Sequence, residues 1–316
     1  MNRDPRVHEP DAVARDLTIP AADGYPLGAK LWESPPSAPP STVALVNAGA
    51  GISLRYYDRF AAFLAANGVP TVVYDYRGIG ASRPASLRGF TATVEDWGRL
   101  DCCGVLDWIA ARYPGVPRTV IGHSVGGFVT GFTTNGHRID RMLLVSAHTG
   151  YWRDYAARAR PWMFVLWHAL MPVVTRAVGY FPGRRLHLLE DLPAGAALQW
   201  ANRRRPDFWW NLKTPTGEMD TERIDEVRAR FRAIRATTLA MQFADDPFAT
   251  DAATDRILGL YENCRADRIV LGPQAADGQP IGHFGFFRSR FRETLWPRAL
   301  SWLVQDRQPV RAQAPA

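Results

Sequence analysis

The residues with the clearest capacity for chemistry in this chain of 316 residues surround one serine. Ser124 stands in the run Gly-His-Ser-Val-Gly at residues 122–126. Glycines two positions before and after a serine permit the tight turn from strand to helix that lifts the hydroxyl clear of a sheet. A serine hydroxyl becomes a good nucleophile when a histidine accepts its proton and a carboxylate orients that histidine. The pattern therefore predicts Ser124 as a nucleophile and requires one histidine and one acid.

The histidine that best fits this role is His283. Of the seven histidines, it is the one that follows the last expected strand, in the run Pro-Ile-Gly-His-Phe-Gly at residues 280–285. The chain order for such a site is serine, then carboxylate, then histidine. A surface-loop histidine would explain the residue but not its position, so we expect His283 to act as general base.

The acid is expected where the strand at residues 237–243 ends. That strand runs into Asp245, Asp246 and Pro247. A carboxylate just past this strand is in the right place to orient the histidine, and Asp246 is the first choice with Asp245 in reserve. The aspartate that does not take this role is expected to stabilise a turn or cap a helix.

Two backbone amides must bind the negative charge that develops on the attacked carbonyl oxygen. The amide of Val125, directly after the nucleophile, is the first expected donor. The second should come from the small-residue run Asn-Ala-Gly-Ala-Gly at residues 47–51, with Gly49 as the first choice and Ala50 next. Substrate contacts are expected from four residues near these segments: Ala50, His123, Trp152 and Phe284.

Alternating apolar strands and amphipathic helices surround these residues. This alternation predicts an α/β fold with a mostly parallel sheet covered by helices on both faces. An N-terminal hairpin is expected over residues 16–19 and 27–32, further strands over 42–46, 71–74, 118–121, 141–145, 237–243 and 268–271, and helices over 56–66, 95–113, from 124, 254–261 and 286–303.

The alternation stops near Gly150 and resumes at residue 237. We therefore expect residues 1–150 and 236–316 to form one core, and residues 151–235 to form an inserted helical cap. The cap holds six of the eleven tryptophans: Trp152, Trp162, Trp167, Trp200, Trp209 and Trp210. They could line an apolar slot with a basic rim, but we favour the interpretation that they form the cap's own core and leave its arginines in water. Likewise, residues 162–174 favour a buried hairpin over a segment that touches a membrane.

Charge and composition limit the kinds of partner that we expect this protein to bind. The formal net charge is +7, but the densest basic run is only Arg203 to Arg205, which favours a solvated face over a nucleic-acid site. The longest apolar stretch is too short to span a membrane. Cys102, Cys103 and Cys264 leave one cysteine unpaired and two adjacent, which favours a reducing, cytoplasmic compartment. We expect no metal and no cofactor, a small-molecule substrate and no stable membrane insertion; the oligomeric state is left open.

The chain resembles a bacterial branch of predicted α/β-hydrolases that is similar to serine aminopeptidases and monoglyceride-lipase-like hydrolases. The elbow at residues 122–127 and the block Asp-Tyr-Arg-Gly-Ile-Gly-Ala-Ser at 75–82 are shared widely among α/β-hydrolases. Blocks specific to the branch lie at residues 150–152, 179–183, 191–195, 245–248 and 281–288. Asn47-Ala48 departs from the His-Gly pair that is common there. The resemblance implies hydrolysis without a metal but names no substrate.

These observations favour a serine hydrolase that cleaves an ester or thioester with an apolar acyl group through an acyl-enzyme. An acyltransferase would use the same intermediate and an alcohol in place of water. An aminopeptidase-like amide hydrolase usually needs acidic cap residues to hold the substrate's ammonium group, and this cap is net basic. A non-catalytic binding protein is least favoured, because all three catalytic positions are filled.

Overall fold

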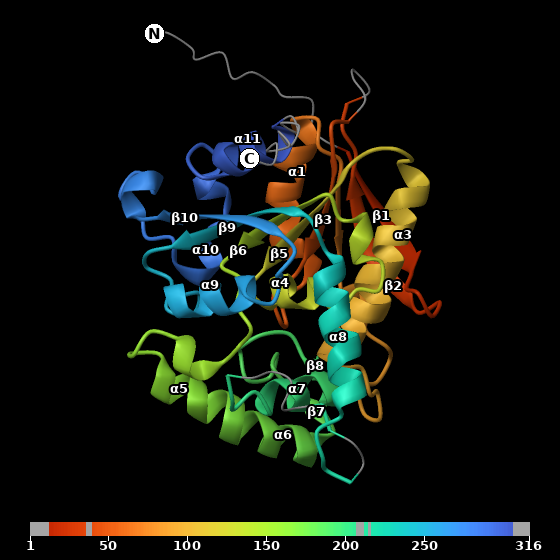
Figure 1. Ribbon diagram of the computed structural model, residues 1–316, viewed down its shortest axis with the longest axis vertical. Helices are drawn as coiled ribbons and strands as arrows, with labels where there is room; N and C mark the ends of the chain where they lie inside the picture. The colour runs from red at the N-terminus through yellow and green to blue at the C-terminus, as the bar shows by residue number, and fades with distance from the viewer. Residues whose placement is uncertain (1–12, 36–39, 207–211, 214–215, 306–316) are drawn as a thin grey trace, which may run out of the picture.

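The computed structural model describes residues 13–35, 40–206, 212–213 and 216–305, and one large sheet organises it (Figure 1). Eight strands pair in the order β1-β2-β4-β3-β5-β6-β9-β10. The pairings that involve β2 are antiparallel and all the others are parallel. The strands are β1 (Ala14–Pro20), β2 (Pro26–Trp32), β3 (Val43–Asn47), β4 (Thr71–Tyr74), β5 (Arg118–His123), β6 (Arg141–Val145), β9 (Thr237–Phe243) and β10 (Arg265–Leu271). The predicted fold class is confirmed.

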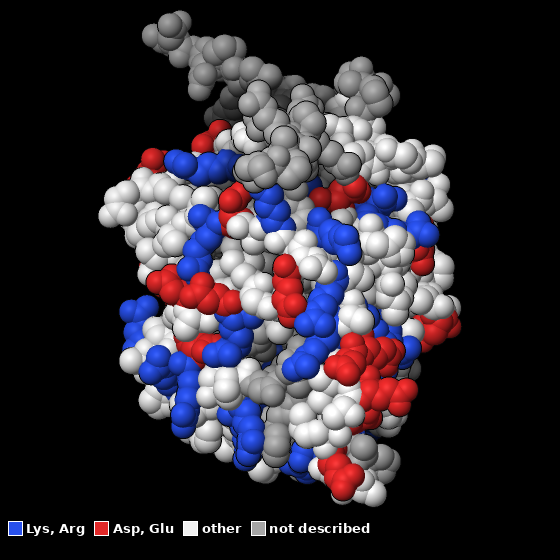
Figure 2. All heavy atoms as spheres, viewed as in Figure 1, with Lys and Arg blue, Asp and Glu red and all other residues white. Residues whose placement is uncertain are grey.

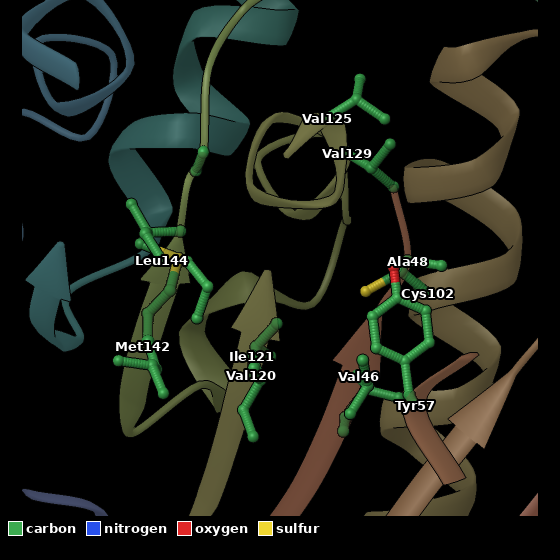
Figure 3. Packing of buried hydrophobic residues seen from close by; sticks show 14 of the residues in the cluster. Val46, Ala48, Tyr57, Cys102, Val120, Ile121, Val125, Val129, Met142 and Leu144 are labelled. Atoms are coloured by element: carbon green, nitrogen blue, oxygen red, sulfur yellow. The ribbon is translucent and has the colours of Figure 1, made fainter. Parts of the chain in front are cut away.

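The central strands are buried along nearly their whole length. Every residue of β3 and β4 is buried, as is every residue of β5 and β6 except the first. Strands with helices on both faces must be apolar at consecutive positions, and this is why they read as short apolar runs. Figure 3 shows part of this core, where Val46, Ile121 and Leu144 come from neighbouring strands and Val129 comes from the helix after β5.

Helices pack on both faces of the sheet (Figure 1). On one face Phe60 lies against Trp296, with ring centroids 5.4 Å apart, and joins α1 (Asp58–Ala66) to α11 (Trp296–Val304). On the other, the ring centroids of Phe128 and Phe231 lie 5.8 Å apart and join α4 (Val125–Thr130) to α8 (Thr221–Ala233). The helices flanking the sheet are α1 (Asp58–Ala66), α2 (Val94–Asp96), α3 (Cys103–Arg112), α4 (Val125–Thr130), α8 (Thr221–Ala233), α9 (Asp251–Leu258), α10 (Gly282–Gly285) and α11 (Trp296–Val304).

Two expected helices differ in detail. The helix expected over residues 95–113 is present, but a π-helical segment, Trp97–Cys102, interrupts it. The single helix expected over 286–303 is wrong. Arg288 is extended there, and regular α-helix begins only at Trp296, with Pro297 in its first turn. Phe286 and Phe287 are buried in the core, so their apolar run reflects packing rather than one face of a helix.

Beyond the carboxyl ends of the parallel strands, in the lower part of Figure 1, lies a second group of helices. One continuous helix runs through α5 (Arg160–Val165), a π-helical segment (Leu166–Leu170) and α6 (Met171–Val178). The expected buried hairpin over residues 162–174 is therefore wrong. A small pair of strands, β7 (Tyr180–Phe181) and β8 (Leu192–Pro193), leads into α7 (Ala194–Ala201).

The division of the chain into a core and a cap at residues 150 and 236 stays a prediction. Within the proposed insertion, α8 packs against the core through Phe231, whereas α5 to α7 lie beyond one end of the sheet (Figure 1). Trp209 and Trp210 lie outside the described residues. In the part of the chain that the structure describes, no helix has both the length and the apolar composition needed to cross a bilayer.

Candidate active site

Ser124 occupies a strained turn between β5 and α4. Its φ of 53° and ψ of −123° lie in a region that residues with a side chain rarely adopt. Such strain costs of order 1–3 kcal/mol and persists where the surrounding structure enforces it. A Cβ atom on Gly126 would lie 2.0 Å from the backbone oxygen of Asn47, and one on Gly122 would lie 2.6 Å from Cα of Gly127. The close approach of strand and helix therefore explains why the flanking positions are glycine.

The structure brings together the three side chains that the sequence singled out. His283 Nε2 lies 2.9 Å from Ser124 Oγ, and His283 Nδ1 lies 2.9 and 3.1 Å from the two carboxylate oxygens of Asp246. All three side chains are buried. Asp246 follows the end of β9 and His283 lies in α10, beyond the end of β10. Parallel strands end at the same sheet edge, which is why residues so far apart in sequence meet here.

The charge state of Asp246 determines which atoms donate and which accept in the hydrogen bonds from Asp246 through His283 to Ser124. Burial raises the pKa of its carboxyl group, but the charge and hydrogen bond of His283 and the amide of Phe248 together lower the pKa below its ordinary value. Oδ1 also accepts hydrogen bonds from the amides of Phe248 and Ala249, at 2.7 and 3.1 Å. A charged carboxylate only accepts, so His283 donates through Nδ1 and presents the lone pair of Nε2 to the serine hydroxyl.

Asp245 has a different position and a different partner. Its carboxylate accepts hydrogen bonds from the amides of Ile281 and Gly282, at 2.8 and 2.9 Å. It thereby ties the segment before His283 to the end of β9. Asp246 contacts the imidazole and Asp245 contacts the backbone that carries it.

A second histidine, His148, lies against Ser124 and was missed by the sequence analysis. It follows β6, and its Nε2 atom lies 3.2 Å from Ser124 Oγ. The serine hydrogen is directed to His283, so His148 must donate through Nε2 and leave Nδ1 as an acceptor. That Nδ1 atom is buried without a hydrogen-bond partner among the described residues. Burial, together with the charge of His283, lowers the pKa of His148 well below its usual value, so the ring is neutral.

A signal for His148 was present in the sequence. The run Ser-Ala-His-Thr-Gly at residues 146–150 follows the strand next to the nucleophile strand. A polar residue in that position faces the same sheet edge as Ser124. The strand order that makes the two strands neighbours could not be read from the sequence.

A fixed chain of hydrogen bonds lies behind the nucleophile. His123 Nε2 lies 3.2 Å from the backbone oxygen of His283, which can only accept, so His123 donates there. Its Nδ1 then accepts from the Tyr57 hydroxyl at 2.9 Å, and that hydroxyl accepts from the amide of Gly49 at 2.8 Å. Burial and the charge of His283 lower the pKa of His123 to about 3, so this ring is also neutral. These hydrogen bonds link the loop after β3, the elbow and the segment that carries His283.

This series of hydrogen bonds decides which backbone amides are available as the predicted oxyanion donors. The expectation that Gly49 supplies the second amide does not fit this geometry, because its N–H already donates to Tyr57. Ala50, the second choice, lines the cavity above Ser124. Among the hydrogen bonds between described residues, the amides of Ala50 and Val125 have no partner. Both can therefore donate to a bound group.

An apolar cavity of about 270 Å³ opens above Ser124. Its lining includes His148 and His283, but no Asp, Glu, Lys or Arg among the described residues. Of the four expected contact residues, Ala50 and Phe284 line this cavity. His123 is buried behind the nucleophile, and Trp152 packs against Phe164 outside the lining. The large apolar side chains of the lining are Ile52, Trp162, Met163, Leu166, Trp167, Leu188, Leu189, Trp200, Phe248 and Phe284.

The described residues contain no group of three or more His, Cys, Asp or Glu side chains that could hold a metal ion. Instead, the site offers a strained serine, a hydrogen-bonded histidine and carboxylate, and free amides next to an apolar cavity. Fold and site together define a serine hydrolase with the α/β-hydrolase fold.

Comparison with known proteins agrees with this class. The chain belongs to the family described as serine aminopeptidase, S33, whose model matches residues 38–266. This confirms the resemblance that the sequence motifs indicated.

Solved structures with the same fold include several esterases. An esterase of Pyrococcus furiosus shares 14% identity with a TM-score of 0.58 over 96% of this chain and 93% of that one. An esterase of Exiguobacterium antarcticum shares 16% identity with a TM-score of 0.55 over 92% of this chain and 100% of that one. A puromycin hydrolase shares 18% identity with a TM-score of 0.52 and aligns with 96% of this chain but 40% of its own.

Proposed function

We propose that this protein hydrolyses a carboxylic ester or thioester with an apolar acyl group, through an acyl-enzyme on Ser124. The observation that carries the proposal is the series from Ser124 through His283 to Asp246 at the base of an apolar cavity. The fold of the esterases reported above is consistent with this chemistry.

In the proposed first step, Ser124 Oγ attacks the carbonyl carbon while its proton moves to His283 Nε2. The Asp246 carboxylate stabilises the imidazolium that forms, because it accepts the hydrogen bond from Nδ1. His283 then gives the proton to the departing alcohol or thiol. In the second step, water loses a proton to His283 and attacks the acyl carbon, and the free acid leaves as Ser124 regains its proton.

We assign the oxyanion donors to the amides of Val125 and Ala50. Loss of one such donor typically reduces the rate by a factor on the order of 10² to 10³. Gly49 is not proposed, because its amide donates to Tyr57. We further propose that His148, by donating to Ser124 Oγ, holds the serine hydrogen toward His283.

The cavity favours an uncharged acyl group of modest size. Its volume of about 270 Å³ lies near the lower end of ligand pockets, which are typically about 300–1,000 Å³. An aminopeptidase would need a carboxylate to hold the substrate's ammonium group, and none of the described lining residues is acidic. A small, neutral, apolar acyl group satisfies both features.

A chain-length series of p-nitrophenyl esters and acyl thioesters tests the proposal. We expect turnover to favour short and medium acyl chains over long ones, with free acid as product even when an alcohol is added. Ser124→Ala should reduce turnover about a millionfold, as expected when residues that act as a unit lose the nucleophile. Ser289→Ala, at an exposed serine, is the matched control and should retain full activity. Turnover that survives in Ser124→Ala rejects the nucleophile, and an ester product identifies an acyltransferase.

We also expect a cytoplasmic location. All three cysteines are free thiols, and two of them are buried, as in proteins of a reducing compartment.

A further inference from the structure

The outer side of the long helix over residues 160–178 is apolar between two arginines. Arg160 and Arg176 are exposed near its ends. Between them Trp162 is 56% exposed, Val165 49% and Val173 65%, and these are large exposures for such side chains. The exposed residues between the two arginines are Pro161, Trp162, Phe164, Val165, Ala169, Leu170 and Val173, and none of them is polar. We call these seven residues the outer face.

This pattern is the reverse of an ordinary surface helix. A helix that packs on a core usually turns a polar side to water. Here Met163, Leu166 and Met171 are buried on the inner side, while the outer side is apolar as well. Contiguous apolar surface of this kind is rare on monomeric proteins and marks an interaction site. The outer face therefore needs a partner.

The charge around the outer face indicates the kind of partner. Residues 151–189 contain six arginines and one acidic residue, Asp154, and Glu190 follows directly. Asp154 is buried and forms an ion pair with Arg256 at 2.5 Å, whereas Glu190 forms one with Arg184 at 2.5 Å, so the positive charge around the outer face comes from the other five arginines. Figure 2 shows Lys and Arg side chains gathered over α5 and α6 on the face it displays. The six arginines are Arg153, Arg158, Arg160, Arg176, Arg184 and Arg185.

An apolar strip flanked by arginines matches an anionic lipid surface. Helices that lie in the membrane interface combine apolar side chains that enter the lipid with basic residues that contact its headgroups. A second copy of this chain fits less well, because a two-fold dimer through this face would bring the two sets of arginines together.

The cavity opens beside the outer face. Trp162 and Leu188 line the cavity, and both are also exposed at the surface. A protein seated on lipid through this helix would present the entrance of its cavity to the lipid phase.

We propose that the outer face docks on the surface of an anionic lipid bilayer, with the helix lying in the interface and not crossing it. The proposal that the protein docks on lipid depends only on the exposed residues and their charge, and not on the proposed function. Only its consequence, that an ester dissolved in lipid can enter the cavity directly, rests on the proposed function.

Vesicle flotation of the full chain tests the docking. The probes are vesicles of phosphatidylcholine alone and vesicles with about 30% phosphatidylglycerol, which supplies the anionic surface. We expect the wild type to float with the anionic vesicles, and less so in about 0.5 M salt, which screens exposed charges. Ser124→Ala should float like the wild type, so a failure of the proposed catalysis leaves the docking result unchanged.

Variants on and off the outer face make the test specific. Val165→Ser with Val173→Ser should weaken binding by about tenfold or more, because these side chains would no longer enter the lipid. Neither residue lines the cavity, so hydrolysis of a soluble p-nitrophenyl ester should be unchanged. Val270→Ser is the matched control, since Val270 is 51% exposed on β10. Arg158→Gln with Arg185→Gln should weaken binding to anionic vesicles.

Three results would overturn the proposal. The first is a folded wild type that stays in solution with anionic vesicles, and the second is equal binding to neutral ones. The third is a dimer in sedimentation velocity that Val165→Ser with Val173→Ser dissociates, without binding to vesicles, which would assign the outer face to a second copy.

Discussion

His148 and His283 present their Nε2 atoms to the same oxygen, the hydroxyl of Ser124, at 3.2 and 2.9 Å. The two ring centroids lie 5.4 Å apart. The hydroxyl has one hydrogen, and Asp246 fixes His283 as its acceptor, so His148 is the donor. A neutral His148 can hold this arrangement without repelling the imidazolium that would form on His283 in the proposed reaction.

Removal of the His148 donor should lower the rate of acylation. His148→Leu leaves the serine hydrogen without a fixed direction, and we expect a loss of about tenfold in kcat with little change in KM, since one hydrogen bond contributes about 1–1.5 kcal/mol. His148→Gln carries an N–H donor near the same position and should recover most of the rate. Stopped-flow release of p-nitrophenol measures the acylation step. Equal rates in the wild type and the leucine variant would exclude this positioning role.

The two adjacent aspartates should separate clearly in kinetics. Asp246→Asn removes the charge that orients His283, and we expect kcat to fall by a factor on the order of 10⁴, as in serine hydrolases that lose this acid. Asp245→Asn removes one acceptor of a backbone amide, and a loss below about tenfold follows from one hydrogen bond. The two variants carry the same substitution at adjacent positions, so a difference between their rates reports the position alone. A larger loss for Asp245→Asn would exchange their roles.

The Tyr57 hydroxyl should contribute more to the free energy of unfolding than one ordinary hydrogen bond, because it has two buried partners. Tyr57→Phe leaves the buried Gly49 amide and the buried His123 Nδ1 without partners, and each unpaired buried group costs about 1–3 kcal/mol. Urea denaturation should therefore give a free energy of unfolding lower by about 2–6 kcal/mol, the sum that the two unpaired groups imply. Tyr56→Phe is the control, because the Tyr56 hydroxyl bonds an exposed carbonyl of Phe284. A difference below about 1 kcal/mol between the two variants would contradict the hydrogen-bond chain.

Acid should act on stability through the two buried neutral histidines. The folded-state pKa values of His123 and His148 lie far below the usual value of about 6.5. Below about pH 6.5 the unfolded chain binds protons at these two positions that the folded chain does not, so stability rises with pH and is lost on acidification; for His123 this continues down to its folded-state pKa of about 3. Each histidine contributes up to about 1.4 kcal/mol per pH unit in this window.

The variant His148→Gln isolates one of these contributions. Between about pH 6.5 and 4.5, the free energy of unfolding of the wild type should fall more steeply than that of the variant, by up to about 1.4 kcal/mol per pH unit. The comparison is between slopes, because burial raises the pKa of Asp75 to about 6 and this carboxyl changes protonation in the same range. His137→Gln, at an exposed histidine, is the control. Parallel slopes would show that His148 is protonated in the folded protein.

Patterns of neighbouring residues in the sequence were enough to predict the elbow, most of the strands and the choice of Asp246 and His283. The spacing of the glycines around Ser124 marked the elbow; the 2.6 Å approach of a Gly122 Cβ to Gly127 is a contact within a few residues, whereas Gly126 is required by the backbone of Asn47, at the end of β3. Short apolar runs marked the strands because both sheet faces are buried. Asp246 and His283 could be selected because each follows a recognisable strand. The helix expected over 286–303 failed because its phenylalanines are buried in the core and the backbone is extended at Arg288.

Only the tertiary structure decided the partners that come from different strands and loops. The order of the strands placed His148 against Ser124, and Tyr57 engaged the amide of Gly49, the predicted oxyanion donor. The packing of the helix over residues 160–178 decided which of its apolar residues are buried and which form the outer face. Composition records how apolar a segment is. Which side of it meets water depends on where the rest of the chain lies.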